Sequence, residues 1–348
     1  MKTFRIALLP GDGVGLEVVP AAVRVLDAVE SRTPGLKLAY QELSVGAAEY
    51  LRSGDPLPPA TFERLREFDA ILLGAMGLPG VRWASGIEMT PQLDLRERLD
   101  LYCGLRPIYL FHSLDSPLRD RAAGSIDFVL VRESTEGLFV NRLRPPEPAS
   151  GCVEDTMRIT RTGAERVVRA AFRQAMGRRK HVTLVDKANV LPSMAFFRMV
   201  FDEVAREFPE VCTDRVYVDA ASLYLVQRPE AFDVMVTENM FGDILSDLSA
   251  GLVGGMGMAP SADIGDRYAV FQPSHGSAPD IAGKGIANPV ATILSAAMML
   301  DWLGAATGAE MIRAAVRSVF SDRQARTRDM GGSLGTTEMT DAIIAALP

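Results

Sequence analysis

Residues 5–31, RIALLPGDGVGLEVVPAAVRVLDAVES, contain the unit from which the class of fold follows. Residues 6–9 are a short apolar run typical of a buried strand, and Pro10 and Gly11 end it. Residues 17–31 predict an amphipathic helix, because the apolar side chains recur at helical spacing. The side chains on that face are Val18, Ala22, Val25, Leu26 and Val29. A strand that leads through a glycine turn into a helix favours an α/β fold.

Helical patterns alternate with further short apolar runs along the chain. These runs are residues 70–73, 127–131, 182–185 and 233–236. Their continuous apolar character predicts strands that are buried on both faces of a sheet. Polar residues follow the runs, and in such sheets ligands bind just beyond the carboxyl ends of the strands. The candidate functional residues are therefore sought there.

Composition and charge exclude several classes of function. The chain has 348 residues and a formal net charge of −7, which argues against non-specific nucleic-acid binding. No apolar stretch is long enough to span a membrane, and the N-terminus lacks the pattern of a signal peptide. The three cysteines have no metal-ligand spacing. We therefore expect a cytoplasmic protein with no nucleic-acid and no membrane partner.

The glycines after the first strand do not form a dinucleotide fingerprint. In Gly11-Asp12-Gly13-Val14-Gly15 the third glycine comes one residue too early for the G-x-G-x-x-G turn. A tight glycine turn between strand and helix is the favoured interpretation. No P-loop lysine follows, which excludes a kinase or nucleotidase of that type.

Three arginines lie in sequence contexts that suit anion binding. Arg106 follows the apolar residues 101–105, and Arg132 comes directly after the run 127–131. The planar guanidinium group offers forked donors that match a carboxylate. Arg132 at the end of a buried strand is hard to explain as a surface charge. For Arg96, in a charge-rich helical segment, a solvated helix face explains the local sequence equally well.

Asp243 and Asp247 are four residues apart at the start of a predicted helix, so they share one helical face. Two like charges there favour a cation between them, and Mg²⁺ and Mn²⁺ prefer carboxylate oxygens. Asp219, at the end of another apolar run, is a third candidate ligand. Acids near a helix N-terminus are also favoured by the helix dipole, so the local sequence supports both interpretations equally.

Lys187 follows the apolar run 182–185. A partly desolvated lysine can have a lowered pKa and act as a base or proton shuttle. The alternative is a plain salt bridge with Asp186, although neighbours on a strand point to opposite faces.

Residues 275–289 form a glycine-rich loop ahead of a long apolar helix, and loops of this composition are usually functional. Backbone amides there allow close approach of a cofactor. Asp280 is placed to accept hydrogen bonds from ribose hydroxyls and to repel a 2′-phosphate, which favours NAD over NADP. His275 alone is more often structural than catalytic.

Together these segments resemble the metal-dependent β-decarboxylating dehydrogenases, the isocitrate/isopropylmalate dehydrogenase family. The segments are residues 9–15, 105–107, 131–133, 186–191, 241–248 and 275–289, and the last two are highly specific. The resemblance implies an NAD-dependent oxidoreductase that acts on a CH–OH group and decarboxylates a 2-hydroxy diacid. 3-Isopropylmalate is the first choice of substrate. The alternatives are a D-malate, tartrate or homoisocitrate-type enzyme, or a non-catalytic relative.

The resemblance also implies a two-domain α/β fold, distinct from the Rossmann fold, with a large mixed sheet flanked by helices. Residues 1–101 and 254–348 would form the cofactor-binding domain. Residues 102–253 would form the domain for substrate, metal and dimerisation, with an arm near residues 141–160. The expected assembly is a homodimer with shared active sites.

By the same resemblance, Arg96, Arg106 and Arg132 would hold the substrate carboxylates. Asp243 and Asp247 would bind Mg²⁺ or Mn²⁺ together with Asp219 from the second subunit. Lys187, also from the second subunit, would assist proton removal from the 2-hydroxyl. The residues implied to bind NAD are His275, Gly276, Ser277, Ala278, Asp280, Ile281, Asn288 and Asn189.

Two positions concern the chemistry and the choice of substrate. Members of the family usually carry a tyrosine seven residues after the third arginine, and it helps to protonate the enolate, whereas this chain has Phe139. Phenylalanine has no proton to donate, so we expect a changed proton path rather than an inactive enzyme. Leu93 stands among the residues that would face the distinguishing substituent. Leu93 and Met89 suit an apolar branch, and Thr90 and Gln92 suit a polar one.

Overall fold

One mixed sheet of ten strands runs through the computed structural model, which describes residues 2–144 and 151–348. The strands follow one another across the sheet in the order β2 (Leu36–Glu42), β1 (Lys2–Gly11), β3 (Ala70–Ala75), β10 (Ala269–Pro273), β9 (Pro260–Ile264), β4 (Cys103–Tyr109), β5 (Asp127–Glu133), β8 (Val234–Thr237), β6 (His181–Asp186) and β7 (Cys212–Tyr217). The outer strands are parallel to their neighbours, and β10, β9, β4 and β5 pair antiparallel in the middle. The expected large mixed sheet is confirmed.

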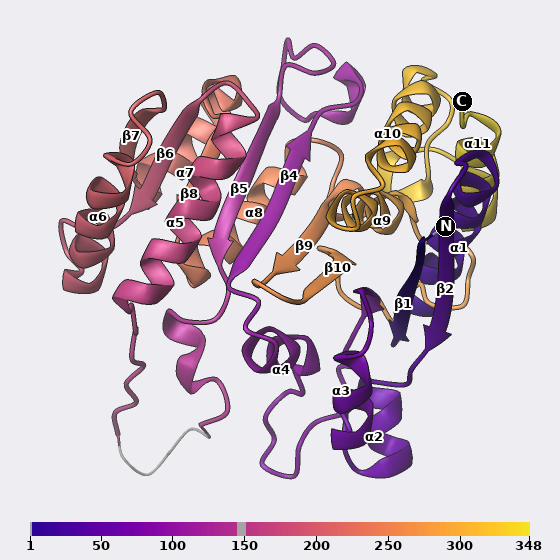
Figure 1. Ribbon diagram of the computed structural model, residues 1–348, viewed down its shortest axis with the longest axis horizontal. Helices are drawn as coiled ribbons and strands as arrows, with labels where there is room; N and C mark the ends of the chain where they lie inside the picture. The colour runs from indigo at the N-terminus through magenta and orange to yellow at the C-terminus, as the bar shows by residue number, and fades with distance from the viewer. Residues whose placement is uncertain (1, 145–150) are drawn as a thin grey trace.

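Helices cover the two faces of this sheet (Figure 1). They are α1 (Gly15–Arg32), α2 (Ala47–Ser53), α3 (Pro59–Leu65), α4 (Pro91–Arg98), α5 (Arg161–Met176), α6 (Pro192–Ala205), α7 (Val218–Gln227), α8 (Asn239–Gly251), α9 (Val290–Trp302), α10 (Ala306–Ser321) and α11 (Thr336–Ala345). In the part of the chain that the structure describes, no helix is long and apolar enough to cross a membrane.

The two ends of the chain lie side by side. Figure 1 shows α1, in indigo, next to α10 and α11, in yellow, and α1 contacts α9 and α11. Helix α9 is buried along most of its length and packs against β9 and β10. Its sequence, which is apolar all round, is typical of a helix inside a core. The first and last parts of the chain therefore share one hydrophobic core.

The glycine turn after β1 is a structural element, as the sequence predicts. Gly11 and Gly13 adopt positive φ angles of 72° and 57°. A Cβ at Gly13 would lie 2.0 Å from the carbonyl oxygen of Ser277, and the Val14 amide donates to that same oxygen at 2.8 Å. Only glycine fits such a close approach of two backbones. The turn thereby holds the glycine-rich loop after β10 in place.

The expected strands at residues 6–9, 70–73, 127–131 and 182–185 are present as β1, β3, β5 and β6, each somewhat longer than its apolar run. The run 233–236 becomes β8 with its start moved by one residue. The helix expected at residues 17–31 is α1. The arm expected near residues 141–160 falls partly outside the described residues, at 145–150.

Candidate active site

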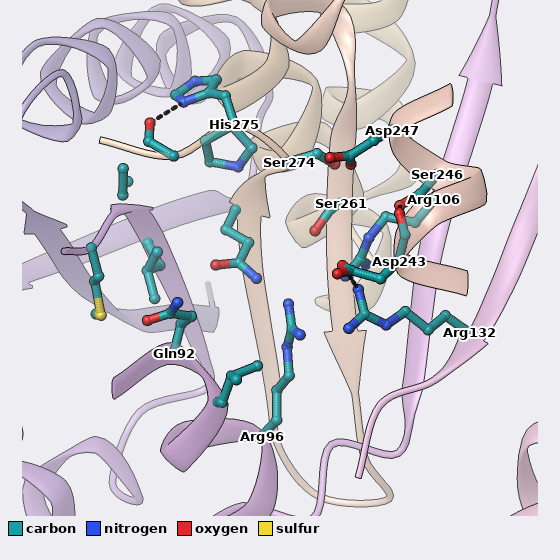
Figure 2. A pocket seen from close by; sticks show the side chains of 18 of the residues that line it. Gln92, Arg96, Arg106, Arg132, Asp243, Ser246, Asp247, Ser261, Ser274 and His275 are labelled. Atoms are coloured by element: carbon teal, nitrogen blue, oxygen red, sulfur yellow. Dashed lines mark hydrogen bonds and ion pairs between the residues drawn. The ribbon is translucent and has the colours of Figure 1, made fainter. Parts of the chain in front are cut away.

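A cavity of about 250 Å³ opens beside the middle of the sheet. Its walls come from β3, α4, β4, β5, α8, β9 and β10 and from the loop after β10. These elements are far apart in the sequence, and the strand order brings them together. Figure 2 shows the side chains that line the cavity.

The three predicted arginines meet in this cavity. Arg96 comes from α4, Arg106 from β4 and Arg132 from β5, and 8%, 4% and 2% of their surfaces are exposed. In Figure 2 the side chains of Arg96 and Arg132 extend from their elements toward the space beside Asp243. The alternative of a solvated helix face for Arg96 is wrong. Buried guanidinium groups need anionic partners, and the surroundings supply them.

Arg132 has one donor that the protein leaves unused. Its Nε donates to Asn239 Oδ1 at 2.9 Å, and Nη1 donates to Asp243. Its Nη2 is buried with no hydrogen-bond partner among the described residues. Burial, reinforced by the positive charge of Arg96, lowers the pKa of Arg132 to about 10. Because a buried donor without a partner costs free energy, this nitrogen is placed to bind an anion that enters the cavity.

Gly242 sets how closely α8 approaches Arg132. A Cβ at this position would lie 2.7 Å from Arg132 Cγ and 2.8 Å from its Cβ, closer than side chains pack. The missing side chain therefore lets the arginine lie flat against the helix, with Asp243 directly beside it. The glycine within the acidic segment has a packing role that the sequence does not reveal.

Asp263, which the sequence does not single out, lies behind the arginines. It is fully buried on β9, and its carboxylate accepts hydrogen bonds from Arg96 Nε at 3.0 Å, Arg106 Nη2 at 3.1 Å and Gln272 Nε2 at 2.8 Å. Burial raises the pKa of Asp263, but the charges of Arg106 and Arg96 outweigh burial and hold this pKa at about 2. The carboxylate is an anion at neutral pH.

Asp243 and Asp247 stand one turn apart on α8 and both line the cavity, as the sequence predicts. Burial and then the charge of Asp243 raise the pKa of Asp247. A divalent cation between the two carboxylates relieves this repulsion and finds the hard oxygen ligands that it prefers. In residues 2–144 and 151–348, no cluster of three or more acidic, histidine or cysteine side chains is arranged to hold a metal ion.

Lys187 and Asp219 contact each other and do not line the cavity. The hydrogen bond from Lys187 lowers the pKa of Asp219, whose side chain is 68% exposed. The predicted alternative, a salt bridge between Lys187 and Asp186, is wrong. Asp186 is buried and instead accepts two hydrogen bonds from Arg198, both at 2.7 Å. Within one chain, Lys187 and Asp219 thus form a separate ion pair at the surface.

The remaining wall of the cavity is partly apolar. Leu93 lines it, as predicted, and Phe139 places its ring 5.4 Å from the guanidinium carbon of Arg132. Met89, which the sequence suggested as a second apolar contact, is buried but does not line the cavity. Met76 lines the cavity instead. Two polar atoms in the lining, Gln92 Oε1 and Ser261 Oγ, are buried without a partner in the described part of the chain. The chamber therefore offers both apolar contacts and unused polar groups.

The glycine-rich loop borders a second cavity, of about 350 Å³, next to the first. His275 lines both cavities, and Ala278, Ile281 and Asn288 line the second. Burial lowers the pKa of His275, so its imidazole is neutral at pH 7. A mostly apolar pocket with a few polar groups suits a planar heterocyclic ring.

The other residues expected around the cofactor are distributed differently. Gly276 lines the first cavity, whereas Ser277 is buried and fixes the turn after β1. Asp280 is exposed on the same loop. Asn189 is exposed beyond β6 and lines neither cavity, so within one chain it stands apart from the loop.

Comparisons with known proteins place this architecture in one family. The model of the isocitrate/isopropylmalate dehydrogenase family matches residues 5–343. A 3-isopropylmalate dehydrogenase of Moorella thermoacetica is 47% identical over 349 residues, which cover 97% of this chain and 97% of that enzyme. An isocitrate/homoisocitrate dehydrogenase of Thermus thermophilus is 46% identical, covering 99% of this chain and 98% of that enzyme.

Solved structures agree with the sequence relatives. The isocitrate dehydrogenase of Methylococcus capsulatus superposes with a TM-score of 0.88 at 38% identity, covering 99% of both chains. A β-decarboxylating dehydrogenase of Thermococcus kodakarensis gives a TM-score of 0.80 at 40% identity, over 99% of this chain and 96% of that one. The chain belongs to the isocitrate/isopropylmalate dehydrogenase family. Its activity is that of an oxidatively decarboxylating dehydrogenase, an oxidoreductase that acts on a CH–OH group.

Proposed function

We propose that this protein catalyses the NAD-dependent and divalent-metal-dependent oxidative decarboxylation of a 2-hydroxy diacid, with 3-isopropylmalate as the preferred substrate, in the cytoplasm. The observation that carries the proposal is the cavity in which three buried guanidinium groups meet two carboxylates. The unused Nη2 of Arg132 supports it further, since it offers a donor to an incoming carboxylate.

Asp243 and Asp247 are the residues that would hold Mg²⁺ or Mn²⁺, and the raised pKa of Asp247 fits a site that gains from a cation. His275, Ala278, Ile281 and Asn288 would receive NAD, with Asp280 near the ribose. When bound, the divalent ion lowers the pKa of the 2-hydroxyl and polarises its oxygen, and the nicotinamide accepts the hydride.

The side chains of this protein position the substrate and move its protons. The three arginines hold the two carboxylates, so that the hydroxyl-bearing carbon faces the loop after β10. A lysine that takes up the hydroxyl proton completes the site, and Lys187 is the candidate. Phe139 has no proton to give, so the carbanion left by the departing CO₂ is protonated by water or by another group.

Two features of the wall bear on the choice of diacid. Leu93 and Met76 favour an apolar branch such as isopropyl, because burying it against them removes apolar surface from water. The buried Oε1 of Gln92 has no partner in the described residues and favours a second candidate, a diacid such as tartrate with a hydroxyl to donate. D-malate and homoisocitrate-type substrates complete the set to be tested.

We also propose a homodimer in which each subunit completes the site of the other. Lys187 and Asp219 lie outside the cavity of their own chain, near exposed apolar side chains on α7 and α8. Leu223, Val226 and Ile244 are 52%, 44% and 58% exposed. A second copy packed on these helices covers that surface and brings in a lysine and a third carboxylate. This arrangement goes with the two-domain division at residues 1–101 plus 254–348 and 102–253.

The direct test is a panel of 2-hydroxy diacids with NAD or NADP, with and without Mn²⁺. The panel comprises 3-isopropylmalate, D-malate, tartrate, isocitrate and homoisocitrate. We expect NADH formation to require Mn²⁺, to be fastest with 3-isopropylmalate, and to be slow with NADP. The rival, a non-catalytic relative, requires that no diacid produces NADH at any metal concentration. That result would refute the proposed function.

A further inference from the structure

We propose that Asp263 determines the charge of the substrate that the cavity accepts, favouring a hydroxy diacid with two carboxylates over a hydroxy triacid with three. This inference rests on the proposed function. It assigns a specificity role to a residue that lies behind the arginines and not in the wall of the cavity.

Asp263 already engages two of the three guanidinium groups. Arg96 gives its Nε and Arg106 gives one Nη2 hydrogen to the Asp263 carboxylate. Arg106 Nη1 is occupied as well, by the backbone oxygens of Leu105 and Ala262. A resident anion therefore neutralises part of the positive charge before any substrate arrives. Of the three arginines in the cavity, Arg132 keeps a buried donor without a partner among the described residues.

The formal charges of the site match a dianion. Three guanidinium groups face three carboxylates, those of Asp243, Asp247 and Asp263, and the lowered pKa of His275 keeps it neutral. A divalent cation on the two acids of α8 then leaves two positive charges, which two substrate carboxylates neutralise. A third carboxylate meets no cation and is repelled by Asp263. Because the group is fully buried, water screens this repulsion little.

Gln272 allows the negative charge of Asp263 to be moved to a neighbouring side chain. Gln272 and Asp263 lie on the neighbouring strands β10 and β9, and Gln272 Nε2 donates to Asp263 Oδ2 at 2.8 Å. The single variant Asp263→Asn removes one negative charge. The double variant Asp263→Asn/Gln272→Glu restores the charge on the neighbouring strand, at a side chain that lines the cavity, keeps the hydrogen bond with donor and acceptor exchanged, and changes almost no volume.

The test measures dissociation constants by titration calorimetry on the full-length protein, with Mg²⁺ present and no nicotinamide, so that nothing reacts. The probes are 3-isopropylmalate, a dianion, and isocitrate, a trianion. In Asp263→Asn we expect the ratio of the two constants to shift toward isocitrate by about tenfold, as expected for two unit charges roughly 12 Å apart at an effective dielectric constant of about 20. In the double variant we expect a ratio within about threefold of the wild-type ratio.

The outcomes separate this inference from the proposed function. If Asp263→Asn weakens the binding of both compounds equally, Asp263 only positions the arginines. This result overturns the charge role and leaves the proposed function unaffected. A double variant whose ratio of dissociation constants differs from the wild-type ratio by more than about threefold overturns the charge role as well. This comparison with the wild type can be made even if the single variant does not fold. Failure of both compounds to bind the wild type refutes the proposed function itself.

Discussion

Replacing Arg132 by lysine separates the role of the forked guanidinium from the role of positive charge. In the structure two nitrogens of Arg132 donate to Asn239 and Asp243, and the third, Nη2, is buried without a partner among the described residues. A lysine ammonium keeps the charge at a single point and does not serve all three directions. A lysine at this position is expected to pair with Asp243, so the free donor that Nη2 offers to a substrate carboxylate is lost.

The size of the loss follows from the hydrogen bond that disappears. A hydrogen bond to a charged group contributes about 1.5–3 kcal/mol, so kcat/KM of Arg132→Lys should fall by roughly tenfold to a hundredfold. The assay is NADH formation with 3-isopropylmalate and Mn²⁺. Arg169→Lys is the matched control, because Arg169 pairs with Glu207 and Glu165 on the surface, away from the cavity, and it should leave kcat/KM unchanged. A folded Arg132→Lys with wild-type kcat/KM would show that the fork is irrelevant.

Four further predictions concern the proton path, the dimer, pH and the metal. Phe139→Tyr should speed CO₂ release relative to NADH formation in single-turnover experiments, whereas unchanged phases would remove Phe139 from the mechanism. Lys187→Met and Asp247→Asn should each be inactive. When the two variants are mixed and their subunits exchange, about a quarter of wild-type activity should return, since half of the dimers then hold one intact site. No recovery of activity would argue against shared sites. In the folded protein the pKa of Asp263, about 2, lies below the ordinary aspartate pKa of 3.8, so its contribution to stability is present above pH 3.8 and is lost as the pH falls toward 2. In Asp263→Asn, the free energy of unfolding in urea should therefore fall less steeply with decreasing pH in that window, and identical slopes would contradict the depressed pKa. Finally, calorimetry should find tighter Mn²⁺ binding with 3-isopropylmalate present, because the diacid releases Asp243 from Arg132; equal affinities would exclude this exchange.

The strands β1, β3, β5, β6 and β8 are predicted from their apolar runs, whereas the edge strands β2 and β7 and the central strands β4, β9 and β10 are not. β3 and β5 contain continuous apolar runs and only Thr183 interrupts the run within β6, so their burial on both faces is visible locally. β9 and β10 have five residues each and carry Asp263 and Gln272 in their interiors. Polar side chains in short segments look like loop residues. Only pairing with distant strands makes them strands.

The same reason limits what the sequence says about the site. Arg106, Arg132 and the acids of α8 are identified because each follows a recognisable apolar run, whereas Arg96 is assigned only through the resemblance to the family. Asp263 is missed, since its role depends on the pairing of β9 with β4, which sets it opposite Gly104, where a Cβ would lie 3.1 Å from its Oδ1. The partner of Lys187 is likewise Asp219 on another element and not its neighbour in the sequence. Local pattern identifies the groups, and the pairing of strands decides their partners.

Each cation of the site is held by an anion of the same chain before any ligand binds. Arg132 contacts Asp243, Arg96 and Arg106 contact Asp263, and Lys187 contacts Asp219. An isolated buried charge costs several kcal/mol, so the pairs of the three buried arginines stabilise the folded cavity, whereas the exposed pair of Lys187 and Asp219 contributes little. On the proposed function, we expect the pair of Asp243 to open when a diacid and a metal ion enter, whereas the buried pairs of Asp263 persist. Some of the ion pairs are thus exchanged for ligands, and the rest fix the charge that remains for the substrate.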